Sequence, residues 1–207
     1  MSARPGTRRL APLAAHLWDE EAVAMLRGRV RQADRFLSGA AGTPPLPNVL
    51  GILGHHPRLS GAWLGYNGVL LEDPALGPRL RELLILRVAR RTGSQYEWLQ
   101  HVRMGRAAGL SDAHLEALAG DLESVEWTPL ERLLLDAADQ LLTDHHIGDA
   151  TWDGLAAHLD ARQLLEIPFV VGSYLCLAMV FSSVGLELDA DMDPASAPPL
   201  PGMEERA

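Results

Sequence analysis

The sequence of 207 residues contains no lysine and only one cysteine. All 18 basic residues are therefore arginines, which excludes chemistry that forms a Schiff base on a lysine. Cys176 has no second cysteine with which to form an intramolecular disulfide or a dithiol couple, which fits a reducing cytoplasm. Because it lies in the apolar run VVGSYLCLAMVF, we interpret Cys176 as a small buried hydrophobic residue.

Aromatic residues make up 5% of the chain, and the net charge is −9. This acidic balance argues against nucleic acid or an anionic membrane as a partner. The basic N-terminus has no continuous apolar segment, so we expect no signal peptide and predict a cytoplasmic location. The apolar stretch at residues 167–186 includes a proline and several small polar residues, which favours a core or subunit-interface helix over a membrane span.

The sequence has no alternating strand pattern and no glycine-rich phosphate loop. Leucine and alanine recur at helical spacing, which predicts an all-α protein of about eight helices joined by short connections. We predict a flexible arm at residues 1–15 and a single helical domain at 16–188. The acidic, proline-rich segment 189–207 is predicted to be disordered.

The helix predicted at residues 78–91 has a glycine stop signal at Gly93. The pattern Ser94-x-x-Glu97 is typical of a capping box and predicts that the next helix starts here and ends at Gly109. Further helices are predicted at residues 18–37, 48–57, 59–73, 128–141, 152–158 and 160–185.

Glu82 lies on an apolar stripe of the 78–91 helix, because the residues three, four and seven positions later are apolar. Burial of a carboxylate raises its pKa toward the range that is useful for proton transfer. Glu82 is therefore a candidate catalytic residue. The alternative is a structural ion pair with a neighbouring arginine such as Arg79 or Arg81.

Glu97 and His101 are four residues apart, so on a helix they share one face with Ser94. A carboxylate can orient an imidazole and fix its tautomer, which is a recurring arrangement in general-base catalysis. The alternative is that Glu97 only completes the capping box and that His101 is exposed. The position of Glu82 relative to the 94–101 face would distinguish catalysis from a structural role.

The sequence offers no pattern typical of a metal or cofactor site, because it contains neither Cys-x-x-Cys nor His-x-x-x-His. We therefore expect no metal and no cofactor. Tryptophans in such a chain are mostly core or interface residues, although Trp98 is also a candidate for contact with a substrate because it adjoins Glu97.

The segment RELLILRVARRTGSQYEWLQHVRMGRAAGLSDAHLEAL resembles the carboxymuconolactone decarboxylase family, which includes the alkylhydroperoxidase D-like proteins. The segments WTPLERLLLDAADQLLTD and FVVGSYLCLAMVFSSVGLEL extend this resemblance. It implies an all-α fold and a homo-oligomer (a trimer, dimer or hexamer) with its active site near a subunit interface.

The peroxidase branch of this family carries a glutamate, a Cys-x-x-Cys motif and a histidine. Glu82 and His101 match the glutamate and the histidine, whereas Ser94 and Glu97 occupy the two cysteine positions. The decarboxylase branch instead carries Glu-x-x-x-His, which Glu97 and His101 match, and it needs no thiol. The resemblance thus favours acid/base chemistry over peroxide reduction.

We therefore expect a cofactor-independent enzyme that decarboxylates, isomerises or eliminates on a small anionic cyclic or unsaturated carbonyl compound. His101 would exchange the proton with the substrate. Glu97 would orient His101 or relay the proton, and Glu82 would complete the relay. The residues expected to contact the substrate are Ser94, Arg81, Arg87 and Trp98. Two alternatives stay open: an oligomeric protein that binds a small molecule without turnover, and a peroxidase that uses Cys176.

Overall fold

The computed structural model describes residues 8–30, 33–38 and 45–201. It is 69% helical, and the described residues contain no strand, which confirms the predicted all-α class. These residues form ten α-helices, of which eight have seven or more residues. The chain divides into two compact units, residues 1–73 with 181–189 and residues 74–180 with 190–207, whereas the sequence pattern predicts one domain at 16–188.

The first unit has a small apolar core that includes residues of α1. Its helices are α1 (Glu20–Arg29), α2 (Ala33–Leu37), α3 (Asn48–Leu53) and α4 (Pro57–Glu72), with the short 3₁₀ helix η1 at Ala15–Leu17. Helix α1 packs against α2 and α4. The buried core residues are Trp18, Ala22, Leu26, Ala33 and Leu50.

The single helix predicted at residues 18–37 is wrong, because α1 and α2 are separate helices. Val30 has extended backbone angles (φ −121°, ψ 117°), so α1 ends at Arg29. Residues 31 and 32 lie outside the described part of the chain. The apolar spacing continues on both sides of the break, and spacing alone therefore cannot reveal it.

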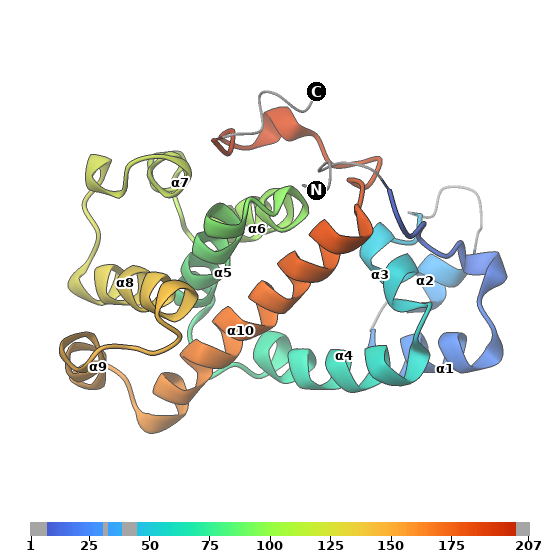
Figure 1. Cartoon of the computed structure of the whole chain (residues 1–207), viewed down its shortest axis with the longest axis horizontal. Helices are drawn as coiled ribbons and strands as arrows, with labels where there is room; N and C mark the ends of the chain where they lie inside the picture. Colours follow the sequence, from blue (N-terminus) through green and yellow to red (C-terminus); the bar gives the residue numbers. More distant parts are fainter. Residues whose placement is uncertain (1–7, 31–32, 39–44, 202–207) are drawn as a thin grey trace, which may run out of the picture. The chain divides into compact units, whose positions relative to one another are not determined.

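The second unit is organised around α5, which packs against α6, α7 and α8 (Figure 1). Its helices are α5 (Pro78–Thr92), α6 (Gln95–Ala107), α7 (Asp112–Ala119), α8 (Pro129–Thr143), α9 (Asp149–Ala156) and residues 161–180 of α10 (Ala161–Val184). Short 3₁₀ helices lie at Leu122–Ser124 (η2) and Pro194–Ser196 (η3). The consecutive residues Leu83, Leu84, Ile85 and Leu86 are all buried, so α5 is covered on every side, as expected of a central helix.

The predicted ends of α5 and α6 are confirmed. Gly93 and Gly109 follow these helices with φ values of 67° and 90°, a left-handed conformation that glycine adopts at little steric cost. Ser94 N then donates to Ala89 O at 3.0 Å, which closes the last turn of α5. The stop at Gly93 ends α5 before the chain reverses, and α6 then packs along α5.

The segment after residue 189 has defined contacts up to residue 201, although the sequence predicts disorder from residue 189 onward. Asp193 caps η3 by accepting a hydrogen bond from Ala195 N, and Arg106 of α6 donates to Ser196 O at 2.7 Å. Leu200 is buried. Local caps and one apolar anchor order this proline-rich segment; residues 202–207 lie outside the described residues.

Helix α10 is long and apolar enough to cross a membrane, by length and composition alone. However, 56% of its most apolar window is buried inside the protein. This burial is typical of a core helix in a soluble fold, as the sequence predicts.

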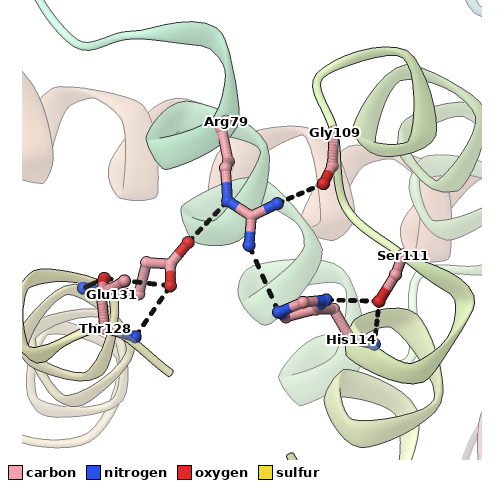
Figure 2. Close-up of polar contacts among 6 residues, drawn as sticks. All are labelled: Arg79, Gly109, Ser111, His114, Thr128 and Glu131. Carbon is pink, nitrogen blue, oxygen red and sulfur yellow. Dashed lines mark hydrogen bonds and ion pairs between the residues drawn. The ribbon is translucent and has the colours of Figure 1, made fainter. Parts of the chain in front are cut away.

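Arg79 of α5 contacts residues of α7 and α8 and so links these three helices of the second unit (Figure 2). Its Nε atom donates to Glu131 Oε1 of α8 at 2.6 Å, its Nη1 atom donates to Gly109 O, and its Nη2 atom lies 3.3 Å from His114 Nε2 of α7. Because a guanidinium only donates, His114 Nε2 must accept, and the ring proton sits on Nδ1, which is 2.5 Å from Ser111 Oγ. Arg79 is therefore not the partner of Glu82.

The charge states of His114 and Glu131 follow from these contacts with Arg79. Burial, and then the nearby Arg79 charge, lower the pKa of His114 and keep it neutral. Burial alone would raise the pKa of Glu131, but hydrogen bonds from Thr128 and Arg79 outweigh it and lower that pKa. The result is one ionised pair and one neutral imidazole that hold α5, α7 and α8 together.

We predict that Thr128→Ala lowers the free energy of unfolding by about 1 kcal/mol, the usual effect of losing an N-cap side chain. Thr128 Oγ1 accepts from Glu131 N at 3.2 Å, and Glu131 Oε2 accepts from Thr128 N at 2.9 Å, so a capping box starts α8. Urea unfolding followed by circular dichroism measures the loss. Thr128→Ser keeps the hydroxyl and is the matched control; equal losses in the two variants would contradict the capping role.

Candidate functional site

The centre of the site is a buried hydrogen bond between α5 and α6. His101 Nδ1 lies 2.7 Å from Glu82 Oε2, and the Glu82 side chain is only 1% exposed. Glu82 Oε1 also accepts from Arg81 Nη2 at 3.4 Å, within the same buried region. Arg81 compensates the charge of the Glu82 carboxylate, and the carboxylate in turn fixes the tautomer of His101 and leaves Nε2 for proton exchange.

The structure contains the contacts that both interpretations of Glu82 require. The carboxylate pairs with Arg81, as the structural alternative requires, and it also binds His101, as the catalytic interpretation requires. The ion pair is buried rather than at the surface. Helical spacing predicted that Glu97 would orient His101; in the structure Glu82 holds the imidazole instead.

Glu97 is the second unusual carboxyl of the site. It is 3% exposed, and neither of its side-chain oxygens has a hydrogen-bond partner among the described residues. Burial raises the pKa of Glu97 to about 8, and the nearby Ser94 hydroxyl lowers it part of the way without meeting the geometry of a hydrogen bond. Glu97 is thus largely protonated at neutral pH.

The capping box predicted for α6 is wrong. Ser94 is the N-cap residue, but its side chain caps no backbone N–H, and its Oγ is buried without a hydrogen-bond partner among the described residues. Glu97 does not turn back to Ser94 N, as a capping box requires. The Ser-x-x-Glu pattern therefore places two unsatisfied polar groups one helical turn apart, on the face that carries His101.

Tyr174 of α10 is a site residue that the sequence analysis did not select. Its ring meets the His101 ring edge-on, with centroids 4.9 Å apart. Burial, and then the negative charge of Glu82, raise the pKa of Tyr174, so its hydroxyl stays protonated. A tyrosine within the apolar run of α10 was the only signal available, and it could not indicate the contact with His101.

The residues expected to contact a substrate have different environments. Arg81 lies beside Glu82. Arg87 forms a bidentate pair with Asp139 of α8, with Nε–Oδ1 at 2.8 Å and Nη2–Oδ2 at 2.6 Å. Trp98 is buried and donates its indole N–H to Pro198 O at 2.8 Å. Only Arg81 and Ser94 of the four expected contacts lie at the Glu82, Glu97 and His101 cluster.

Cys176 is exposed on α10, so its interpretation as a buried hydrophobic residue is wrong. The apolar run of α10 is not buried on all sides: Leu165 and Met179 are exposed as well. A uniformly apolar helix sequence gives no indication of which face is covered.

The site combines a histidine that is oriented by the Glu82 side chain with a second carboxyl, Glu97, that is held as an acid. An imidazole held in one orientation and a carboxyl whose pKa is raised by burial are suited to the base and acid roles of a proton transfer. His101 can accept a proton at Nε2, and Glu97 can donate one. This arrangement can move a proton between carbon and oxygen of a bound molecule without a thiol.

The fold has clear relatives among solved structures. A peroxidase-related protein with an alkylhydroperoxidase AhpD core from Ralstonia eutropha JMP134 superposes with a TM-score of 0.73 at 18% identity, over 92% of this chain and 96% of that chain. A debrominase in complex with 2,3,4-tribromopyrrole gives a TM-score of 0.67 at 16% identity, over 90% and 95%. A putative antioxidant defence protein AhpD from Agrobacterium tumefaciens gives 0.62 at 20% identity, over 68% and 97%.

No curated protein matches the chain in sequence. The family model of the carboxymuconolactone decarboxylase family matches residues 57–140, which include Glu82, Glu97 and His101. Residues 57–140 of the chain thus match the carboxymuconolactone decarboxylase family, and the chain shares the alkylhydroperoxidase D-like fold of the solved structures.

Proposed function

We propose that the chain is a cofactor-independent acid/base enzyme that moves a proton on a small carbonyl compound in the cytoplasm. Decarboxylation, isomerisation and elimination share this chemistry, because each passes through an enol or enolate. The observation that supports the proposal most strongly is the buried hydrogen bond of 2.7 Å between His101 Nδ1 and Glu82 Oε2.

In the proposed mechanism Glu82 is a positioning residue and His101 is the catalytic base. Glu82 accepts the Nδ1 proton, keeps the imidazole in one orientation and stabilises the imidazolium that forms when Nε2 takes a proton. Arg81 provides a positive charge beside Glu82 in the same buried region. Glu97, on the same face of α6, is the proton donor rather than the orienting partner that spacing suggested.

The proposal omits a thiol step. The positions at which the peroxidase branch carries its cysteines hold Ser94 and Glu97, and the single cysteine of the chain lies on an exposed face of α10. A dithiol reduction of peroxide needs two thiols that can form a disulfide. The peroxidase-related and debrominase neighbours therefore support the fold of this chain but not their own chemistry here.

We predict that His101→Ala lowers enolisation of a simple ketone by at least about 100-fold, the lower bound of a general-base contribution. Exchange of carbon-bound hydrogen for deuterium in methyl levulinate, followed by NMR in D₂O, measures the rate. Glu82→Gln keeps the shape but loses the charge, so we expect a smaller loss than for His101→Ala. His146→Ala, at an exposed histidine between α8 and α9, is the matched control; wild-type exchange in His101→Ala would refute the proposed function.

We further propose that the chain self-associates as a dimer, trimer or hexamer. Leu165 and Met179 lie on one face of α10 and are 61% and 57% exposed, and Cys176 lies on the same face. Covering such an apolar face would be favourable. We expect multi-angle light scattering to give a multiple of 22.5 kDa that Leu165→Asp with Met179→Asp reduces to the monomer; a wild-type monomer would contradict this.

A further inference from the structure

Glu97 and Ser94 present three buried oxygen atoms without hydrogen-bond partners among the described residues. Buried polar atoms are nearly always hydrogen-bonded, and each exception costs stability. Other buried carboxyls of this protein follow the rule: Glu131 binds Arg79 and Thr128, and Glu82 binds Arg81 and His101. The unsatisfied atoms of Glu97 and Ser94 are therefore suited to a ligand that supplies the missing partners.

The charges around Glu97 restrict that ligand. Tyr174 of α10 lies within electrostatic range of Glu97 and also of Arg81 and Glu82 of α5, and Glu82 binds His101, which lies one turn after Glu97 on α6. The Arg81 cation is already matched by the Glu82 carboxylate, and Tyr174 is neutral. An additional negative charge, whether on Glu97 or on a ligand, would have no compensating cation in this cluster.

Arg79 and Arg87 of α5 are each engaged by a carboxylate of α8. Arg79 is bound to Glu131, and Arg87 is bound to Asp139. The carboxylate of an anionic substrate, which Arg81 or Arg87 was expected to contact, would thus enter a region whose positive charges are engaged.

Building on the proposed function, we infer that Glu97 acts as an uncharged carboxylic acid that donates a hydrogen bond to the carbonyl oxygen of an uncharged substrate. The substrate class is a ketone, ester or lactone with an acidic C–H beside the carbonyl group. This selects isomerisation or elimination over decarboxylation, because loss of carbon dioxide needs a carboxylate on the substrate. Ser94 Oγ, one turn earlier on the same face, provides a second hydroxyl for the same polar group.

The proposed step is balanced without an oxidant or reductant. His101 Nε2 takes the proton from the carbon next to the carbonyl group, and the electron pair of that C–H bond forms a carbon–carbon double bond. The carbonyl π pair moves onto oxygen, which takes the proton of Glu97 and gives an enol. When the substrate has a β,γ double bond, the His101 proton returns to the γ carbon and the enol proton returns to Glu97, which gives the conjugated isomer and restores both groups. Return to the same carbon exchanges that hydrogen with the solvent.

The protonation of Glu97 can be tested without turnover. The folded protein holds this proton to a pKa of about 8, compared with 4.5 for the ordinary carboxyl. The resulting stabilisation is fully present below the ordinary pKa of 4.5 and is lost as the pH rises through about 8. We therefore expect the Tm difference between the two proteins, wild type minus Glu97→Gln, to fall steadily across this pH range.

Glu116→Gln, at an exposed position of α7, is the matched control for loss of a carboxyl, and its Tm difference from the wild type should not show this fall. A Glu97→Gln difference that stays flat or grows with pH would overturn the inference, since Glu97 would then be ionised in the folded protein.

The donor role can be tested with methyl levulinate and levulinate, an uncharged and an anionic form of one ketone. We expect the ester to exchange at least about tenfold faster than the acid, because the acid brings an uncompensated charge. Glu97→Ala should lower exchange of the ester by about 100-fold, the usual cost of removing one donor to a developing oxyanion. Glu97→Gln keeps an N–H donor and should lose far less.

The wild-type rate should also fall above a pH of about 8, as Glu97 ionises, and this fall should be absent in Glu97→Gln. Preference for levulinate, or equal losses in Glu97→Gln and Glu97→Ala, would overturn the inference and leave the proposed function intact. The second outcome would indicate an ionised Glu97, as for a cationic substrate. Wild-type exchange in His101→Ala, or exchange of neither probe by the wild type, would instead refute the proposed function and with it the inference that rests on it.

Discussion

The site depends on one buried contact, the hydrogen bond between Glu82 of α5 and His101 of α6. A carboxylate that is 1% exposed is tolerated only with partners, and Arg81 and His101 are the partners that the structure provides. The contact requires α6 to return along α5, and the left-handed glycines Gly93 and Gly109 set the two ends of α6. The turn at Gly93 lies between the two residues of this contact, so the reversal of the chain there brings Glu82 and His101 together.

Much of this frame could be predicted from the sequence. Apolar spacing and glycine stop signals predicted α5 and α6, and a polar residue on the apolar stripe of α5 singled out Glu82. Spacing of three and four residues placed Ser94, Glu97 and His101 on one face. These predictions succeeded because they concern neighbours within one helix, where geometry follows directly from the sequence.

Predictions that depended on contacts between distant segments were less successful. The sequence could not show that Glu82, rather than Glu97, binds His101, because 19 residues and a helix reversal separate the two. It could not show that Tyr174 packs against His101 from α10, or that Trp98 is engaged by Pro198. The exposure of Cys176 likewise depends on which face of α10 is covered. In each case the composition of the segment fits several tertiary arrangements.

The failed capping box of α6 is the most informative of these differences. A capping box would satisfy Ser94 and Glu97 locally, as the same pattern does for Thr128 and Glu131 in α8. Leaving a buried polar group without a partner costs about 1–3 kcal/mol. Local sequence rules are broken mainly where function requires it. The carboxyl group of Glu97 lacks a hydrogen-bond partner among the described residues, and it lies on the face that carries His101. A bound carbonyl group would provide that partner.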